Sequence, residues 1–140
     1  MIIGIVGSEK AKFSSIGEEK ALQLLRDIIS QPEVSEVVSG GCHLGGIDIW
    51  AIQIAKELGV KTTEFIPEHL SWEFYKKRNL LIARRSDVVH CITVDRLPDS
   101  FKGMKFDFCY HCKTDTHIKS GGCWTMKQAV HGILHVIQNS

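Results

Sequence analysis

The chain has 140 residues, of which 44% are hydrophobic and 24% charged, as is typical of one globular domain spanning residues 1–140. The formal net charge of +1 argues against a broad, strongly basic nucleic-acid-binding surface. No apolar stretch has the length of a membrane span, and the first residues lack the basic region and cleavage site of a secretory signal. Five cysteines are an odd number, which favours reduced thiols in the cytoplasm, or metal binding, over a disulfide framework.

Strand and helix patterns alternate along the chain. Short apolar runs such as MIIGIV predict buried strands, and Ser15 with Glu18 has the form of a capping box at a helix start. Pro32 ends the first predicted helix, and Gly59 is suited to end the second. In chain order the patterns predict a strand at 1–6, a helix at 15–29, a strand at 34–38, a helix at 47–58, a strand at 60–66, a helix at 71–85, a strand at 88–94 and a helix at 124–137. Residues 95–119 show no helical period and form an insert before the last helix.

This order predicts a Rossmann-like α/β fold with three layers. Strands that alternate with helices form a mostly parallel sheet, here of about four to five strands, with helices on both faces. Ligands of such sheets bind outside the carboxyl ends of the strands. Gly7 and Ser8, the loop at 39–46 and the insert all follow predicted strands, so we expect them to meet at one crevice.

The tetrapeptide Ser-Gly-Gly-Cys occurs twice, at 39–42 and at 120–123, each time where a loop is predicted to turn into a helix. Paired glycines let the backbone approach a ligand closely, and the N-terminus of a helix favours a bound anion such as phosphate. Two such loops in one short chain suggest a site that grips a nucleotide-like ligand from two sides. The alternative is that the glycines only make tight turns.

Three segments, in the same order, resemble the SLOG superfamily, which joins DNA-processing protein A to the "lonely guy" phosphoribohydrolases. SGGCHLGGIDIWAIQIAKELG resembles the glycine-rich SG-x-A-x-GID segment of DNA-processing protein A, YKKRNLLIARRSDVV resembles its RN-x-x-IA-x-x-S segment, and KSGGCWTMKQA resembles its SG-x-x-x-TA segment. The resemblance implies a Rossmann-like fold, a nucleotide, nucleotide-derived or nucleic-acid ligand, and assembly into homo-oligomers. It also implies that Arg78 is a phosphate clamp. The candidate ligand-binding residues are Gly7, Ser8, Ser39, Gly40, Gly41, Gly45, Gly46, Asp48, Arg78, Asn79, Ser120, Gly121, Gly122, Trp124 and Thr125.

The resemblance does not extend to the catalytic residue of the phosphoribohydrolases. Their motif is PGG-x-GT-x-x-E, and its Glu aligns with Gln128. An amide cannot take up a proton as a carboxylate does, so hydrolysis would need another acid such as Asp48 or Glu73. We therefore expect binding, by a sensor or sequestering protein, rather than turnover. The alternatives are a nucleotide N-glycosidase and a single-stranded nucleic-acid-binding module.

Cysteine and histidine side chains are concentrated at the end of the insert. Cys109, Cys112, His117 and Cys123 have close to zinc-knuckle spacing, and thiolates with an imidazole suit tetrahedral zinc. Such a zinc would be structural and would fix the second glycine loop; no organic cofactor is indicated. His111 is an alternative to His117 as a ligand, and the cysteines could instead be reduced thiols packed as small hydrophobes.

Several single residues have two interpretations. Asp48, at a helix start, could stabilise the positive helix end or bind a ribose or base. Trp124 could stack on a base or pack in the core, whereas Trp50 is expected in the core. His131 and His135, four apart on a predicted helix, have metal-capable spacing, but a partly buried or solvated pair is favoured.

Overall fold

A computed structural model describes residues 1–106 and 108–140 of the chain; Asp107, inside the predicted insert, lies outside the described residues. The elements, in chain order, are β1 (Ile2–Gly7), a 3-10 turn (Lys10–Lys12), α1 (Ser15–Ile29), β2 (Glu36–Ser39), α2 (Ile47–Glu57), β3 (Lys61–Glu64), α3 (Trp72–Arg85), β4 (Val88–Val94), α4 (Gly121–Gln128) and β5 (Gly132–Ile137).

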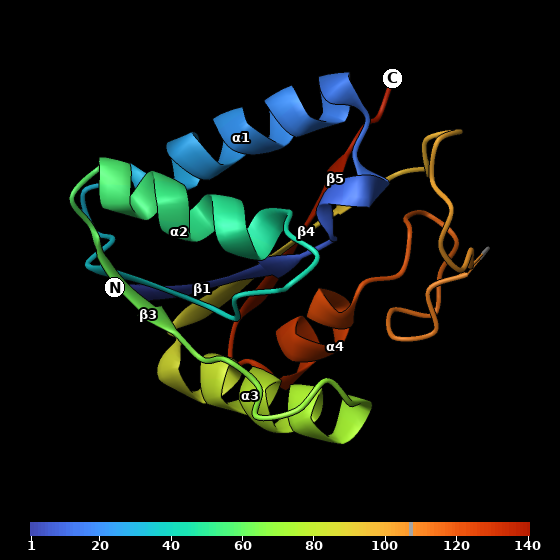
Figure 1. Cartoon of the computed structure of the whole chain (residues 1–140). Helices are drawn as coiled ribbons and strands as arrows, with labels where there is room; N and C mark the ends of the chain where they lie inside the picture. The colour runs from blue at the N-terminus through green and yellow to red at the C-terminus, as the bar shows by residue number, and fades with distance from the viewer. Residues whose placement is uncertain (107) are drawn as a thin grey trace.

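The strands form one five-stranded sheet in the order β3-β2-β1-β4-β5, and each neighbouring pair is parallel. Helices α1 and α2 cover one face, and α3 and α4 lie side by side on the other (Figure 1). The predicted three-layer α/β fold with a parallel sheet is therefore confirmed. Because all strands run the same way, their carboxyl ends lie at one edge of the sheet. The strand order reverses at β1, since β2 and β3 lie on one side of it and β4 and β5 lie on the other.

The predicted helix at 124–137 is wrong. Helix α4 ends at Gln128, and Gly132–Ile137 forms β5, which pairs in parallel with β4. The backbone bends sharply here, and a Cβ on Gly132 would collide with the side chain and carbonyl of Met126. The segment GILHVI is rich in β-branched residues, and the open edge of β4 supplies its hydrogen-bonding partners.

This correction also removes the expected pair of histidines on one helix face. His135 lies on β5 and stacks on His90 of β4, with Nδ1 of His90 2.9 Å from Nε2 of His135. His131 is exposed before the strand begins.

The start of α1 also differs from the prediction. Ser14, rather than Ser15, is the N-cap, and its hydroxyl accepts a hydrogen bond of 3.0 Å from the N–H of Gly17. Ser71 is the N-cap of α3 as predicted, and Gly59, with φ of 72°, follows the last residues of α2. The remaining boundaries shift by a few residues; β3, for example, is shorter than the predicted strand at 60–66.

Two apolar cores lie on the two faces of the sheet. Side chains alternate along β1, so Ile3 and Ile5 pack with α1 and α2, whereas Val6 packs with α3 and α4. Trp50 packs against the first core, 5.2 Å between ring centroids from Phe13, as expected. Cys109 of the insert belongs to the second core, which ties the insert to the domain.

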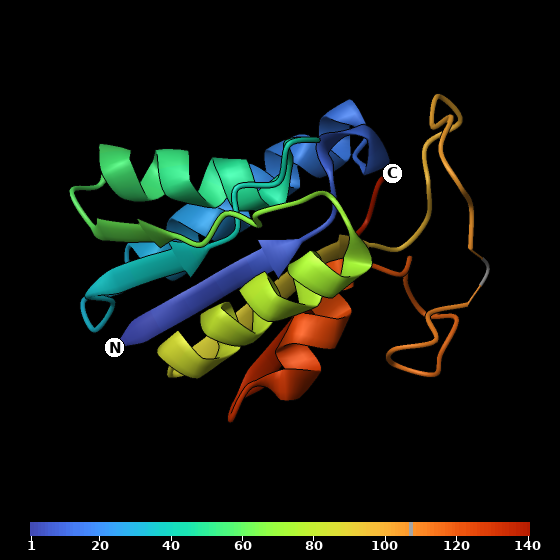
Figure 2. The same cartoon turned by 60° about the horizontal axis from the view of Figure 1, so that its bottom comes forward.

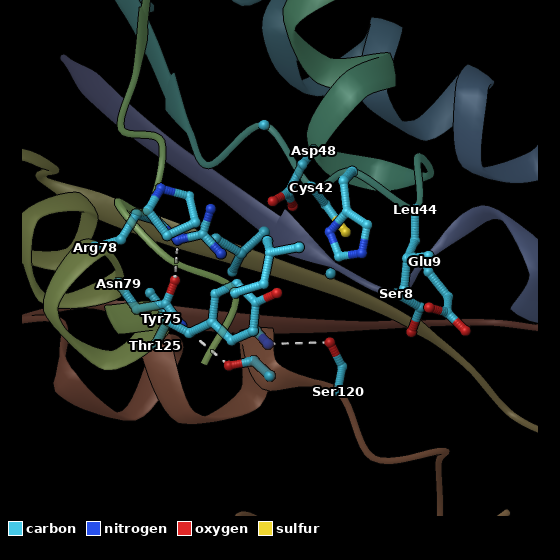
Figure 3. A pocket seen from close by; sticks show the side chains of 18 of the residues that line it. Ser8, Glu9, Cys42, Leu44, Asp48, Tyr75, Arg78, Asn79, Ser120 and Thr125 are labelled. Atoms are coloured by element: carbon cyan, nitrogen blue, oxygen red, sulfur yellow. Dashed lines mark hydrogen bonds between the residues drawn. The ribbon is translucent and has the colours of Figure 1, made fainter. Parts of the chain in front are cut away.

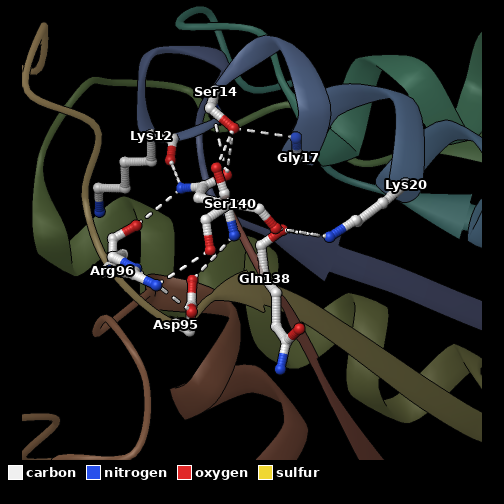
Figure 4. Close-up of polar contacts among 9 residues, drawn as sticks. Lys12, Ser14, Gly17, Lys20, Asp95, Arg96, Gln138 and Ser140 are labelled. Atoms are coloured by element: carbon white, nitrogen blue, oxygen red, sulfur yellow. Dashed lines mark hydrogen bonds and ion pairs between the residues drawn. The ribbon is translucent and has the colours of Figure 1, made fainter.

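A polar clamp joins the chain end to the connection between β1 and α1 (Figure 4). The side-chain amide of Asn139 donates to the carbonyls of Lys12 (2.9 Å) and Arg96 (2.7 Å), and its oxygen accepts from the N–H of Ser14 (3.1 Å). The backbone N–H of Asn139 donates to the Asp95 carboxylate at 3.0 Å. Because Asn139 is buried, these bonds fix three segments that meet near the carboxyl edge of the sheet.

The insert leaves β4 at this edge and passes outside the sheet to the start of α4 (Figure 2). Its described residues contain no helix and no strand longer than the single bridge between Cys109 and Thr114, in agreement with the absence of a helical period. Within the described chain, no helix combines the length and the apolar character needed to cross a bilayer.

Candidate functional site

A pocket of about 280 Å³ opens at the carboxyl edge of the sheet, between the connection after β1, the loop before α2, the first turns of α3 and the start of α4 (Figure 3). Its described lining residues are Val6, Gly7, Ser8, Glu9, Lys12, Gly41, Cys42, His43, Leu44, Asp48, Ile66, Pro67, Leu70, Trp72, Tyr75, Arg78, Asn79, Ser120, Gly121, Gly122 and Thr125. The pocket lies where the strand order reverses, as the sequence led us to expect.

The pocket brings together most of the residues that the sequence singled out. Those that line it are Gly7, Ser8, Gly41, Asp48, Arg78, Asn79, Ser120, Gly121, Gly122 and Thr125. Those outside its described lining are Ser39, Gly40, Gly45, Gly46 and Trp124.

The residues outside the lining support the pocket from behind. The hydroxyl of Ser39, which is fully buried, donates to the carbonyl of Ile5 at 2.6 Å and so ties β2 to β1. Gly45 and Gly46 have φ of 75° and 88°, which favour glycine. Trp124 packs edge-on against Trp72, 5.7 Å between ring centroids.

Two glycines allow the helix N-termini to approach the end of β1. A Cβ on Gly46, the N-cap of α2, would collide with the backbone of Ser8–Lys10, and the N–H of Ile47 donates to the Ser8 carbonyl at 3.2 Å. On the other side, a Cβ on Gly122 would lie 2.9 Å from the backbone nitrogen of Gly7. The first turns of the two helices therefore border the same pocket, α2 through Asp48 and α4 through Gly121 and Gly122.

Arg78 joins the ends of β2 and β3 to α3. Its Nη1 donates to the carbonyl of Gly40 and, at 3.5 Å, to that of Phe65, and its Nε donates to Oδ1 of Asn79 at 2.7 Å. The guanidinium also lies over the ring of Tyr75, 5.6 Å from its centroid. Among the described residues none accepts from Nη2, so Arg78 can position the pocket wall and still present a donor to an anion.

Asp48 is the buried acid of the pocket. It is only 6% exposed, and burial raises the pKa of its carboxyl from 3.8 to about 6. Arg78 and the hydrogen-bonding N–H groups of Gly7 and Cys42 oppose this rise. The carboxyl can therefore exchange a proton near neutral pH, and its protonation would remove a negative charge from the pocket.

The start of α4 forms the opposite wall. Ser120 is its N-cap, and the Ser120 hydroxyl accepts from the N–H of Gly122 at 3.0 Å. Behind it, Thr93 of β4 shares a hydrogen bond of 2.9 Å with Ser8 and donates to the carbonyl of Ile118 at 2.7 Å. This chain of contacts fixes the end of the insert, and with it Ser120 and Gly121, beside the end of β1.

The sequence did not single out several residues that line the pocket. Lys12 is partly buried there, donates from Nζ to the carbonyl of Lys119 at 3.3 Å, and has a pKa lowered mainly by burial. Glu9 and the apolar rim of Leu44, Ile66 and Leu70 were also missed. The sequence did contain a signal for Glu9 and Lys12, because both lie in the connection after the first predicted strand, whose carboxyl end was expected to border the crevice.

The residues proposed as alternative acids differ in position. Asp48 lines the pocket, whereas Glu73 is exposed and lies outside its described lining. Gln128, at the glutamate position of the phosphoribohydrolase motif, is the last residue of α4, exposed, and also outside the described lining.

The thiols and imidazole of Cys109, Cys112, His117 and Cys123 lie together, each ligand atom within 4.8 Å of the others, and could hold a metal ion. Four ligands around one zinc ion lie about 4 Å apart, so the group is close to the required spacing. The Nδ1 of His117 lies 3.1 Å from the Thr116 hydroxyl, which leaves Nε2, 3.7 Å from the Cys123 sulfur, facing the cluster. His111 lies elsewhere, beside Tyr110 and Trp72.

The electrostatics of the cluster favour a cation. A hydrogen bond from Cys91, 4.0 Å away, contributes most to lowering the pKa of Cys123 to about 5. Burial, followed by the negative charge of Cys123, raises the pKa of Cys112 to about 12. Burial and repulsion thus oppose a second thiolate, and a bound cation would offset both by pairing with several thiolates.

Comparison with known proteins gives a likeness in fold. Neither a protein-family model nor a curated protein sequence matches the chain. Among solved structures, the chain is similar to the molybdenum cofactor carrier protein of Chlamydomonas reinhardtii, with a TM-score of 0.57 and 17% identity over 96% of this chain and 88% of that one. At this identity the likeness supports the α/β fold.

The contacts of the two glycines at the start of α4 predict opposite effects of the same substitution. Gly122→Ala should cost about 1–3 kcal/mol of unfolding free energy, because its Cβ would press on the backbone of Gly7 and on the Cys91 sulfur. Gly121→Ala is the matched control: its Cβ meets no atom within 4 Å, and alanine favours the helix, so stability should stay equal or rise by up to about 1 kcal/mol. Urea unfolding followed by circular dichroism measures both; equal losses would contradict the close approach.

Burial of Asp48 predicts a pH-dependent difference between the protein and its Asp48→Asn variant. A carboxyl whose pKa rises on folding, here from 3.8 to about 6, stabilises the folded state while protonated and loses that contribution as pH rises through this window. From about pH 4 to about pH 7.5 the protein should therefore lose roughly 1–3 kcal/mol relative to the variant. Urea unfolding of both proteins at both pH values measures this difference in unfolding free energy. A difference that does not change with pH would show that folding does not raise the pKa of Asp48.

Proposed function

We propose that the chain binds a nucleotide or nucleotide-derived phosphate ligand in the pocket at the carboxyl edge of the sheet and holds it without turnover, as a sensor or sequestering protein. The observation that carries this proposal is the convergence of the first turns of α2 and α4, through Asp48 and residues 120–122, with Arg78 and Lys12 around one cavity of about 280 Å³. Backbone N–H groups at helix starts are a recurrent phosphate-binding device.

The chemistry of the walls fits a ligand with a charged and an apolar end. The N–H groups at the start of α4, together with Lys12 and Arg78, favour an anion, whereas Ile66, Pro67 and Leu70 offer apolar contact. Asp48 and Glu9 oppose an anion. The raised pKa of Asp48, about 6, weakens this opposition below neutral pH.

The absence of the phosphoribohydrolase glutamate supports the proposal of binding without turnover. The position of the phosphoribohydrolase glutamate is Gln128, which cannot act as an acid or base. Of the described lining residues, Asp48 and Glu9 are the carboxylates. The name of the similar structure, a molybdenum cofactor carrier protein, supports carriage of a small molecule, and the SLOG-like motifs support a nucleotide. A cytoplasmic location and assembly into homo-oligomers stay predictions.

Isothermal titration against nucleoside mono- and triphosphates, cyclic dinucleotides and the molybdenum cofactor tests the proposal. We expect at least one to bind with micromolar affinity, and Arg78→Lys, which keeps the charge but loses the planar fork, to weaken it about tenfold or more. Lys127→Ala, on the exposed end of α4, is the control that should leave affinity unchanged.

Failure of the folded protein to bind any of these compounds below millimolar concentration would refute the proposal. Release of free base would instead establish an N-glycosidase, and a salt-sensitive gel shift on single-stranded DNA without nucleotide binding would favour a nucleic-acid-binding module.

We also propose that the cluster of Cys109, Cys112, His117 and Cys123 holds structural zinc. The four donors match a closed tetrahedral set, in which the protein itself supplies every ligand. Three of them come from the insert and Cys123 comes from the first turn of α4, so the ion would fasten the insert to the helix that lines the pocket.

The zinc proposal predicts close to one zinc per chain in protein purified without added metal. Cys109→Ser should lose the metal and unfold the insert, detected as faster proteolysis between residues 95 and 119. Cys42→Ser, which changes a cysteine of the pocket outside the cluster, should keep the metal. Substoichiometric metal together with freely titrating thiols would show that the cysteines are packed as reduced side chains.

A further inference from the structure

One face of α3 presents aromatic rings to the pocket. Trp72 and Tyr75 line the pocket together with Arg78, at intervals of three residues, which places all three on the same side of the helix. The rings lie toward the start of the helix and the guanidinium lies toward the sheet, where it contacts the ends of β2 and β3. The wall thus changes from aromatic at the rim to cationic about 9 Å further along the helix.

Trp72 is held in position yet remains open to solvent. Its ring meets that of Trp124 of α4 edge-on, at 5.7 Å between centroids with an angle of 74° between planes. The Lys76 ammonium lies 6.0 Å from its centroid, and His111 of the insert lies 6.2 Å away. Despite these neighbours the residue is 45% exposed. A large ring held by neighbours but uncovered beside a pocket offers a flat surface to a ligand.

The insert extends this surface. Tyr110 lies 4.5 Å from His111 between ring centroids, and the Lys119 ammonium lies 5.0 Å from the ring of Tyr110. Tyr110 and His111 are located between Cys109 and Cys112, two residues of the metal-capable cluster. The local fold of the cluster therefore positions the outer part of the same aromatic rim.

We propose that Trp72 forms a stacking subsite for the planar ring of the bound ligand, a nucleobase or a comparable fused heterocycle, with Trp124 behind it as a positioning residue. This inference rests on the proposed function and adds the orientation of the ligand: the ring lies at the rim on Trp72, and the phosphate lies inward, near Arg78 and the start of α4. Aromatic stacking accepts every base, because each base has a π face. The subsite thus selects for a planar ring, and other contacts of the pocket discriminate among rings.

The occupant is the ring of a small ligand rather than a nucleic-acid strand. Trp72 lines the same pocket as the candidate phosphate-binding groups, so the ring and the phosphate of one molecule can be bound together. A strand would need a basic groove that continues past the rim, whereas the chain has a net charge of only +1.

Titrations with two types of probe, the four ribonucleoside monophosphates and ribose 5-phosphate, separate stacking from phosphate binding. Trp72→Ala should weaken the best-bound nucleotide by roughly 5- to 150-fold and change ribose 5-phosphate by less than about twofold. Trp72→Phe, which keeps a ring, should restore most of the affinity. Leu81→Ala is the matched control and should leave both affinities unchanged, because Leu81 is a large, exposed apolar residue of the same helix that lies outside the described lining of the pocket. Nucleotide, but not ribose 5-phosphate, should also quench tryptophan fluorescence in the unaltered protein and not in Trp72→Phe.

The outcomes distinguish the subsite from the function on which it rests. If nucleotides bind the unaltered protein and Trp72→Ala binds them equally well, the stacking subsite is wrong and the proposed function stands. Equal weakening of nucleotide and ribose 5-phosphate would make Trp72 a structural residue and would also overturn the subsite. If neither these probes nor any compound of the wider nucleotide and cofactor panel binds the folded protein, both proposals fall. Oligonucleotide binding that greatly exceeds mononucleotide binding and depends on Trp72 would replace the small ligand by a strand.

Discussion

The close approach of two helix starts to the end of β1 is the constraint on which the pocket depends. Gly46 lies against the backbone of Ser8–Lys10, and Gly122 lies against the backbone nitrogen of Gly7, so no side chain fits at either contact. Larger residues would push α2 and α4 apart and would carry their N–H groups away from each other. The parallel sheet supplies the common edge, but these two contacts determine how tightly the walls of the pocket close around a ligand.

The rest of the fold holds this edge in place. On one side, Asn139 ties the chain end to Lys12 and Ser14, which fixes the connection after β1 that carries Glu9 and Lys12 into the pocket. On the other side, Thr93 joins Ser8 to Ile118 and so delivers the end of the insert to Ser120. Segments far apart in the sequence therefore meet through partly or fully buried hydrogen bonds, and loss of a partner would weaken the contact between the segments.

Short sequence patterns predicted the elements of this protein that depend on neighbouring residues along the chain. Apolar runs located β1 and β4, and glycine-rich loops located much of the pocket. The segment after Gln128 was misjudged because its apolar spacing fits a helix, whereas the open edge of β4, known only in three dimensions, makes it a strand. Trp72 and Tyr75 were missed for a similar reason: their spacing predicts only a helix face, and the sheet order decides that this face lines the pocket. The cysteine spacing succeeded because a metal-capable set has a strong local signature, although the contribution of Cys91 from β4 could not be seen.

The first turn of α4 belongs to both candidate sites, and this sharing has an energetic consequence. Ser120, Gly121 and Gly122 line the pocket, and the next residue, Cys123, belongs to the metal-capable cluster. The insert buries few large apolar side chains besides Phe101, so packing alone contributes little to ordering the insert that leads into this turn. A metal ion that orders the insert next to this turn would reduce the conformational entropy that is lost when a ligand binds. Because such coupling is reciprocal, a bound ligand would raise the affinity for the metal by the same factor. The chain therefore joins a segment with little core of its own to the start of α4, where the pocket and the metal-capable cluster meet.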